Sequence, residues 1–295
     1  VVCLDNFITG KRENIEEFSS YPNFTLFEGD IREQKDCEKA VKDVEIVFHQ
    51  AALGSVPRSI NDPHTTNEIN ITGFLNMLIA ARDAGIKRFI YASSSSVYGD
   101  NTALPKEEDR IGNPLSPYAL TKQVNEYYAL LFSELYGMET IGLRYFNVFG
   151  KRQDPLGPYA AVIPKFIALL LKGETPVING DGEQTRDFTY IENVVQANQL
   201  AASTTSTNAI NKVYNIAFGE STTVNRLAGE LKTLLTSFMP EIQNIELQYG
   251  EERQGDVKHS FASVEKAARL LEYQPQYGMQ KGLEAAIQWY AENLK

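Results

Sequence analysis

Short apolar segments alternate with amphipathic segments along the first half of this chain, and that alternation restricts the fold more than any other feature. The apolar segments are brief and show no alternation of polar and apolar positions. Strands of this kind are buried on both faces, as in parallel sheets that carry helices on each side. The sequence therefore predicts an α/β fold with a doubly wound parallel sheet. We expect strands at residues 1–4, 24–27, 44–48, 89–92 and 140–144, and helices at 33–42, 65–84 and 118–136.

The chain changes character after Gly150, where prolines become more frequent. Apolar residues at helical spacing still recur there, but the extended segments between them are shorter. This pattern indicates a second, smaller lobe that closes over the mouth of the sheet. We expect its helices at residues 160–172, 224–237, 264–271 and 279–293, short extended segments at 176–179 and 187–191, and a strand at 213–217.

Charge and composition exclude several classes of function. The formal net charge of −10 argues against nucleic acid as a partner, because neutralising phosphates requires a basic surface. No apolar run reaches the ~20 residues that a membrane helix needs, so no membrane partner is expected. Cys3 and Cys37 lie in separate segments without metal-type spacing, which favours a reduced compartment, the cytoplasm. The three histidines form no pair at ligand spacing, so we expect no metal site.

The segment that begins at Ser116 carries the strongest chemical signal. Ser116 suits an N-cap, Pro117 the first helical position, and Gly137 the end of a helix. Tyr118 and Lys122 are four residues apart and therefore share one face of that helix. An ammonium ~4 Å from a phenol contributes roughly 4 kcal/mol at an effective dielectric near 20, or about three pKa units. We expect Lys122 to lower the pKa of Tyr118 enough for the phenol to act as a base.

Hydroxyl side chains follow the strand expected at residues 89–92. Ser94 and Ser95 come at its carboxyl end, which is the edge where ligands bind in α/β sheets. A rigid strand end would hold these hydroxyls in place beside the phenol. The predicted catalytic residues are Tyr118, Lys122, Ser94 and Ser95.

Four motifs follow one another along the chain: Ser94, Tyr98-Gly99, Tyr118-x-x-x-Lys122, and Arg144-Tyr-Phe-Asn147-Val-Phe-Gly150. Together they resemble the extended branch of the short-chain dehydrogenase/reductase superfamily, which modifies nucleotide sugars. Within that branch the chain is most similar to bacterial UDP-N-acetylglucosamine 4-epimerases of surface-polysaccharide pathways, over nearly all of its 295 residues. The resemblance implies a Rossmann-type NAD-binding domain at residues 1–147 and 187–217, and a nucleotide-sugar-binding lobe at 148–186 and 218–295.

The resemblance implies NAD as the cofactor. It places the adenosine ribose against Asp5 and Asn6, where a carboxylate would repel the 2′-phosphate of NADP. The family's first strand, glycine-rich turn and first helix have no counterpart in this sequence, which opens at Val1 with the end of a strand. We therefore expect an amino-terminally truncated domain. The cofactor-binding residues implied are Asp5, Asn6, Thr9, Gly10, Asp30, Ile31, Gln50, Ala51, Ala52, Asn70, Tyr118, Lys122 and Tyr145.

The same resemblance implies a UDP-sugar substrate. Arg186 and Arg253 match the two arginines that hold the diphosphate, a task that suits the bidentate guanidinium. Ser260 matches a position that limits what fits beside C2 of the sugar, and a small residue there leaves room for an N-acetyl group. The substrate-binding residues implied are Ser55, Arg58, Ser94, Ser95, Asn147, Ala161, Val162, Val177, Asn179, Arg186, Arg253, Asp256 and Ser260.

The residues after Ser94 separate the reactions that this scaffold supports. Dehydratases of the family carry Asp-Glu where this chain has Ser95 and Ser96, and xylose-forming decarboxylases carry a glutamate at the second position. Serine cannot act as a carboxyl acid or base, so 4-epimerisation is expected, with UDP-GlcNAc and UDP-GalNAc as the sugars. Arg58 leaves a uronic acid, UDP-N-acetylglucosaminuronate or UDP-glucuronate, as an alternative.

Two further expectations concern the whole chain. Without the glycine-rich turn, a non-catalytic remnant that binds nucleotide sugars or dimerises stays open as a second class of function. Family members usually form homodimers, and the resemblance implies contacts through the helices expected at residues 65–84 and 118–136.

Overall fold

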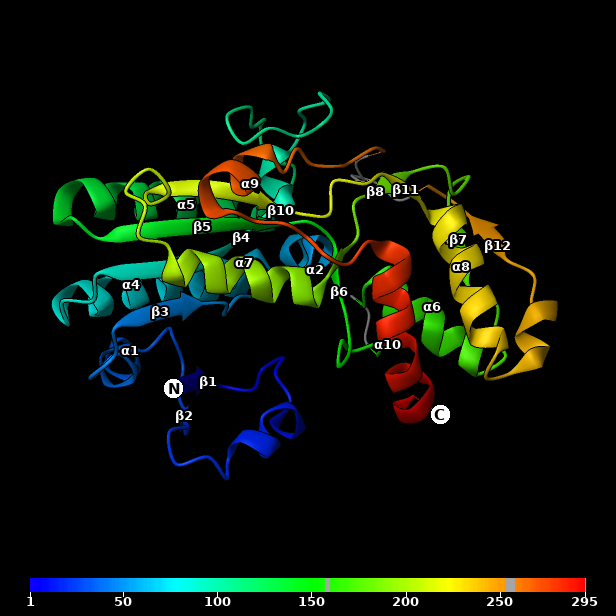
Figure 1. Ribbon diagram of the computed structural model, residues 1–295, viewed down its shortest axis with the longest axis horizontal. Coiled ribbons are helices and arrows are strands. Elements are labelled where there is room, and N and C mark those ends of the chain that lie inside the picture. Colours follow the sequence, from blue (N-terminus) through cyan, green and yellow to red (C-terminus); the bar gives the residue numbers. More distant parts are fainter. Residues whose placement is uncertain (157–159, 253–257, 295) are drawn as a thin grey trace. The chain divides into compact units, whose positions relative to one another are not determined.

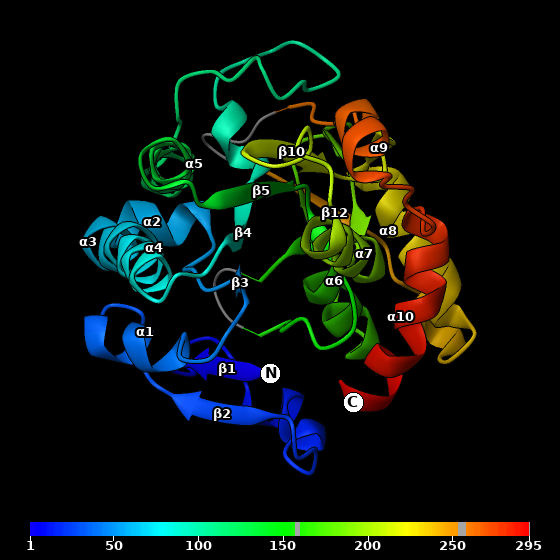
Figure 2. The same ribbon diagram turned by 60° about the vertical axis from the view of Figure 1, so that its left-hand side comes forward.

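The computed structural model describes residues 1–156, 160–252 and 258–294. The chain divides into two compact units. Unit 1 comprises residues 1–101, 111–144 and 198–214, and unit 2 comprises 102–110, 145–197 and 215–295. Figures 1 and 2 show the helices and strands of both units.

Unit 1 is built on parallel strands, as the apolar segments predict. The larger sheet has the order β10-β5-β4-β3, and β3 pairs with β4 in parallel with Val47 opposite Phe89. A separate pair, β1 with β2, is also parallel. The predicted α/β fold class is confirmed. The strands are β1 (Val2–Asp5), β2 (Thr25–Glu28), β3 (Ile46–His49), β4 (Arg88–Ser94), β5 (Glu139–Tyr145) and β10 (Lys212–Ile216).

Helices α2 to α5 lie together on one face of the larger sheet (Figure 2). Their apolar faces meet the strands in a core that includes Phe74, Leu78, Phe89 and Phe132. The segment expected as one helix at residues 65–84 is helical throughout, with a π-helical turn inside it. The helical elements are η1 (Arg12–Asn14), η2 (Glu16–Phe18), α1 (Gln34–Ala40), α2 (Val56–Asn61), α3 (Pro63–Asn67), η3 (Glu68–Gly73), α4 (Phe74–Asp83), η4 (Ser95–Tyr98) and α5 (Pro117–Tyr136).

Unit 2 is a helical layer with short two-stranded sheets. Helices α6, α8 and α10 bury Phe166, Leu227, Leu231 and Leu283 in a common core. β12 pairs with β7, β11 with β8, and β9 with β6. Its elements are β6 (Val148–Phe149), α6 (Val162–Leu171), β7 (Val177–Asn179), β8 (Thr185–Arg186), β9 (Thr189–Tyr190), β11 (Thr222–Thr223), α8 (Val224–Thr236), η5 (Pro240–Asn244), β12 (Gln248–Gly250), α9 (Glu265–Leu271) and α10 (Met279–Asn293).

Two helices were not anticipated by the sequence pattern. Helix α7 (Ile191–Ser203) begins directly after β9, in a region where no helix was predicted after the extended segment at 187–191. Helix α2 occupies the segment of Ser55 and Arg58, for which no helix was predicted, and Ser55 caps it by accepting a hydrogen bond from the Arg58 backbone N–H at 3.3 Å.

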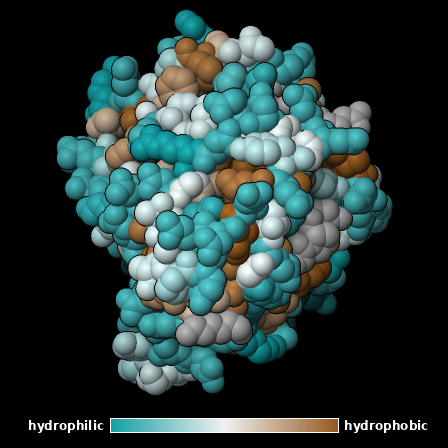
Figure 3. Space-filling view, turned by 90° about the vertical axis from the view of Figure 1, so that its right-hand side faces the viewer, coloured by the Kyte–Doolittle hydropathy of each residue, from teal (hydrophilic) through white to brown (hydrophobic). Residues whose placement is uncertain are grey.

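No helix in the part of the chain that is described is both long and apolar enough to cross a membrane. The face drawn in Figure 3 is mostly hydrophilic, with smaller hydrophobic areas between.

Candidate active site

Helix α5 presents the two residues on which the predicted chemistry depends. Ser116 caps the helix by accepting a hydrogen bond from the Ala119 N–H at 3.1 Å, and Gly137 ends it with φ of 69°. Tyr118 is half-buried and the Lys122 side chain is buried, one turn further along. Local capping signals therefore place both groups on one helix face, as expected from their spacing.

Ser94 stands at the carboxyl end of β4 and caps the 3-10 turn η4. Its hydroxyl accepts a hydrogen bond from the Ser96 N–H at 3.2 Å. The Ser94 and Tyr118 side chains are also hydrogen-bonded to each other. The structure therefore brings the predicted serine and tyrosine into direct contact inside unit 1.

The expected effect of Lys122 on Tyr118 is not found. Burial raises the pKa of the Tyr118 hydroxyl, and the hydrogen bond from Ser94 is what lowers it. The Lys122 ammonium donates to the Ala92 carbonyl at 2.8 Å instead. Burial also lowers the pKa of Lys122 to about 8. The prediction that this lysine alone makes the phenol acidic is wrong, because it considered spacing and ignored the loss of water from both groups.

The turn after Ser94 carries hydroxyls and no carboxylate. Ser95 and Ser96 open η4, and the Ser96 hydroxyl is buried with no hydrogen-bond partner among the described residues. Gln123 on α5 holds this turn by donating to the Val97 carbonyl at 3.1 Å. Ser95 and Ser96 therefore offer no carboxyl acid or base at this position.

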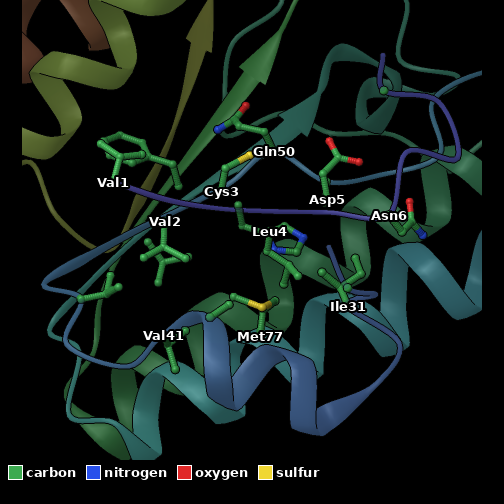
Figure 4. Close-up of a pocket in the computed structure, with 18 of the residues that line it drawn as sticks. Val1, Val2, Cys3, Leu4, Asp5, Asn6, Ile31, Val41, Gln50 and Met77 are labelled. Carbon is green, nitrogen blue, oxygen red and sulfur yellow. The ribbon is translucent and has the colours of Figure 1, made fainter. Parts of the chain in front are cut away.

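Eight of the predicted cofactor residues line one cavity of 880 Å³ in unit 1. The cavity is lined by the whole of β1 and β3, by residues between 40 and 45 before β3, and by the segments that follow both strands, so the eight residues form only part of its wall. In Figure 4, Asp5 and Gln50 lie on one side of the β1 backbone, with Val2, Val41 and Met77 on the other. The eight are Asp5, Asn6, Thr9, Gly10, Ile31, Gln50, Ala51 and Ala52.

Asp5 and Gly10 fit the ribose of a dinucleotide. The Asp5 carboxylate is half-buried and accepts the Phe7 N–H at 2.7 Å. A Cβ on Gly10 would lie 2.9 Å from Oδ2 of Asp5, so a larger residue there would require this carboxylate to shift. This arrangement suits NAD, whose ribose hydroxyls donate to such a group.

Asp30 and Asn70 are among the predicted cofactor residues that lie outside the cavity lining. Asp30 pairs with Arg32 at 2.7 Å and accepts from Asn6 at 2.8 Å, and the Arg32 side-chain hydrogen bonds hold the pKa of Asp30 at about 2. Asn70 sits in the π-helical turn and binds the Leu53 backbone N–H at 2.8 Å. Asn70 thus ties its helix to the backbone of Leu53, next to the predicted cofactor residues 50–52.

β1 and β3 both line the cavity, yet no backbone ladder joins them within the described ranges. The sequence has no Gly-x-x-Gly-x-x-Gly segment, the turn on which a pyrophosphate rests in this fold. The residues that are present fit the adenosine-ribose part of NAD. Tyr145, the last predicted cofactor residue, ends β5.

Unit 2 brings together three of the predicted substrate residues around β8. The Ser260 N–H and the Arg186 guanidinium both donate to the Thr185 carbonyl, at 3.1 Å and 2.8 Å. Asn147, with φ of 32°, donates to the Asp187 carbonyl at 3.1 Å. The others lie further along the unit: Ala161 and Val162 at the start of α6, and Val177 and Asn179 in β7. Arg253 and Asp256 lie outside the described residues.

Asp187 is a residue that the sequence analysis missed, although it adjoins Arg186. Its side chain is fully buried, and its carboxylate accepts backbone N–H groups of Phe218 at 3.1 Å, Gly219 at 3.0 Å and Ala262 at 3.3 Å. Burial raises the pKa of Asp187 to about 6, against the opposing effect of these donors. One carboxyl group therefore organises the segments beside the predicted substrate residues.

The chain is similar to known proteins of one family. A family model described as the NAD dependent epimerase/dehydratase family matches residues 1–217. A putative UDP-glucose 4-epimerase of Methanocaldococcus jannaschii is 38% identical over 296 residues, covering 99% of this chain and 91% of that protein.

Two solved structures are similar over the whole chain. One is a UDP-N-acetylglucosamine 4-epimerase from Methanobrevibacter ruminantium M1 in complex with UDP-N-acetylmuramic acid, with a TM-score of 0.91, 41% identity, and 99% of this chain and 90% of that chain covered. The other is a UDP-glucuronic acid 4-epimerase from Bacillus cereus in complex with UDP-glucuronic acid and NAD, with a TM-score of 0.88, 29% identity, and 99% and 91% covered.

We expect the stability of the protein to show the raised pKa of Asp187. Between about pH 4 and pH 6 the unfolded chain has released this proton while the folded chain keeps it, so Asp187 costs roughly 3 kcal/mol of stability as the pH rises. In Asp187→Asn that cost is absent. The melting temperature of the unaltered protein should therefore fall toward that of Asp187→Asn as the pH rises from 4 to 7.

Asp109→Asn serves as the control, because the Asp109 side chain is 93% exposed. The difference in melting temperature between Asp109→Asn and the unaltered protein should not vary with pH. A difference for Asp187→Asn that widens with pH would contradict the prediction, since it would mean that the backbone donors outweigh burial and keep the carboxylate charged.

Proposed function

Because the chain belongs to the NAD-dependent epimerase/dehydratase family, we propose that it interconverts the C4 epimers of a UDP-hexose, with UDP-GlcNAc and UDP-GalNAc as the pair. Similarity at 41% identity to a solved UDP-N-acetylglucosamine 4-epimerase supports this choice of sugar. The chain would act in reversible oxidation and reduction at one carbon of the sugar.

The observation that carries the proposal is the hydrogen-bonded pair Ser94 and Tyr118 beside a turn that lacks carboxylates. Expelling water or carbon dioxide from the sugar needs an acid or base besides the phenol. Ser95 and Ser96 cannot supply one. Epimerisation needs a single proton relay, and Tyr118 is enough for it.

In the proposed reaction, Tyr118 accepts the proton of the sugar 4-hydroxyl, and Ser94 donates a hydrogen bond to the same oxygen. Lys122, anchored on the Ala92 carbonyl, fixes the helix turn that carries the phenol and offers its remaining protons to a ribose. The 4-keto sugar, formed as C4 gives up a hydride to bound NAD, would then turn about its diphosphate link. It would regain the hydride on the other face of C4 while Tyr118 returns the proton to the C4 oxygen. Tight binding of the diphosphate with weak binding of the sugar permits this rotation.

NAD is the cofactor of this family, and it supplies a positively charged hydride acceptor for C4 when bound. Asp5 and Asn6 would hold its adenosine ribose, and Gln50, Ala51 and Ala52 line the same cavity. Lys122 and Tyr145 would contact the nicotinamide side. These assignments follow the family pattern and the lining of the cavity.

Unit 2 would hold the UDP group. Arg186 adjoins the segment of Ser260, so one small region could bind the diphosphate and limit the substituent at C2. Asn147, Ala161, Val162, Val177, Asn179, Arg253 and Asp256 complete the proposed substrate set.

A uronic acid is the second candidate substrate. Arg58 lies on α2 immediately after the 50–55 segment and could pair with a C6 carboxylate. The likeness at 29% identity to a UDP-glucuronic acid 4-epimerase supports this alternative. UDP-N-acetylglucosaminuronate and UDP-glucuronate are therefore included in the tests.

We also propose that the chain forms a homodimer through α5. Four apolar residues form an exposed stripe along this helix: Leu120 (49%), Tyr127 (57%), Leu131 (47%) and Leu135 (68%). Soluble monomers rarely expose a contiguous apolar patch of this kind, and a two-fold dimer would cover it.

The first test measures conversion of four sugars, UDP-GlcNAc, UDP-glucose and their two uronates, by the purified protein supplied with NAD. We expect UDP-GlcNAc to be converted fastest, and Tyr118→Phe to reduce kcat by a factor of 10² or more because the proton relay is lost. Faster conversion of a uronate would favour the alternative substrate. No conversion of any sugar, with no bound nicotinamide, would identify a non-catalytic remnant.

The second test addresses the room beside C2. Ser260→Tyr should reduce kcat/KM for UDP-GlcNAc roughly ten-fold or more while leaving UDP-glucose nearly unchanged, because the phenol fills space that the acetamido group needs. Ser260→Ala is the matched control and should leave both sugars unaffected. Equal loss on both sugars with Ser260→Tyr would remove this residue from the specificity determinants.

The third test concerns assembly. The unaltered protein should sediment with twice its chain mass of 33.0 kDa, and Leu131→Glu should sediment as a single chain, because a buried carboxylate would face the apolar stripe of the partner. Leu156→Glu, at an exposed residue of unit 2, should stay dimeric. A dimer that survives Leu131→Glu would exclude the α5 interface.

A further inference from the structure

A buried carboxylate lies directly behind the catalytic pair. Glu126 is four residues after Lys122 and eight after Tyr118, so all three side chains project from one side of α5. Arg144 on β5 binds it with two parallel hydrogen bonds, from Nε to Oε1 at 2.9 Å and from Nη2 to Oε2 at 2.8 Å. The Arg144 and Glu126 side chains are only 3% and 11% exposed.

The same carboxylate is bound to the strand that carries Ser94. The Ser93 hydroxyl donates to Oε1 of Glu126 at 2.5 Å. Arg144 also donates to the Tyr98 hydroxyl at 3.1 Å and lies over its ring, 5.0 Å from the centroid. Glu126 therefore links the helix of Tyr118, the end of β4, the η4 turn and β5.

Stability alone does not explain such a group. Replacing a buried ion pair by well-packed apolar residues is often neutral or stabilising, because two charges must lose their water to form the pair. The Glu126–Arg144 pair is hydrogen-bonded to Ser93, which precedes Ser94, and to Tyr98 in η4. These bonds next to the catalytic residues point to a role in the site.

We propose, on the basis of the epimerase function, that Glu126 is a positioning residue that holds Lys122 in its charged form and fixes Ser94 against Tyr118. Hydrogen bonds from Arg144 and Ser93 fix the position of the Glu126 carboxylate beside α5. Without it, the ammonium would lie in a buried site with no negative charge to balance it.

Electrostatics of the surrounding groups support this role. Burial lowers the pKa of Lys122, and the charge of Glu126 acts in the opposite direction. On β3, His49 is neutral, because burial and the charge of Lys122 lower its pKa to about 3. On β4, burial raises the pKa of Tyr91, so that phenol is neutral too.

The helices packed on α5 contribute charged groups that are more open to water, where their effect is screened. These groups are Arg58 on α2, His64 on α3, Glu68 on η3 and Arg82 on α4. Within the described chain, Glu126 is the group whose negative charge acts on Lys122.

The test follows the ammonium itself, in the protein as it is and without cofactor. Lysine labelled with ¹³C at Cε is titrated by NMR, and the Lys122 signal is assigned from its loss in Lys122→Arg. In the unaltered protein the pKa of Lys122 should be about 8. In Glu126→Gln it should fall by about one unit or more, a ten-fold change in the acid constant.

Two further variants make the result decisive. Glu126→Gln with Arg144→Gln leaves no arginine buried without its carboxylate, so it should fold even if the single variant does not, and its Lys122 pKa should still fall. Glu134→Gln removes an exposed carboxylate from the same helix and should change nothing. An unshifted Lys122 in folded Glu126→Gln or in the folded double variant would overturn the proposal.

The outcome is separable from that of the proposed function. A shifted Lys122 with no turnover of any sugar would reject the epimerase and keep the electrostatic role. Full turnover of a sugar, with an unshifted Lys122 pKa in Glu126→Gln, would support the epimerase and reject the electrostatic role of Glu126.

Discussion

Lys122, Glu126 and Arg144 carry charges that are largely shielded from water next to Tyr118 on α5. The rest of the site depends on how these positive and negative charges offset one another. Lys122, Glu126 and Arg144 are joined to backbone or to each other by hydrogen bonds of 2.8–2.9 Å. In such surroundings, burial disfavours the charged forms of the Tyr118 phenol and the Lys122 ammonium, so both need a partner to ionise. Ser94 gives Tyr118 one hydrogen bond, and a positively charged nicotinamide would bring the remaining stabilisation.

The fold could be predicted where the signals are local. Helix α5 begins and ends where Ser116, Pro117 and Gly137 indicate, because caps act within one turn. The strands were recognisable as unalternating apolar segments. Helix α7 was not predicted, because it follows β9 without a capping residue between them. Helix α2 carries the Ser-x-Pro type of start, yet its six residues are too few to show a helical period.

The site divides in the same way. Eight predicted cofactor residues line one cavity because most of them end or follow β1 and β3, and both strands line that cavity along their length. Spacing could not reveal the sign of the pKa shift at Tyr118, which depends on burial. Nor could it reveal the Glu126–Arg144 pair, whose partners come from a helix and a strand 18 residues apart. Asp187 likewise acts through backbone groups of residues 218, 219 and 262, which only the folded chain assembles.

The ionisation of Tyr118 in the ligand-free protein tests this account most directly. Protein labelled with ¹³C at tyrosine Cζ can be titrated by NMR into the alkaline range, and the spectrum of Tyr118→Phe identifies the signal. The account predicts a pKa above the ordinary value of about 10, because burial outweighs the hydrogen bond from Ser94. A phenol that loses its proton near neutral pH would contradict it, and would show that Lys122 is sufficient to activate this residue.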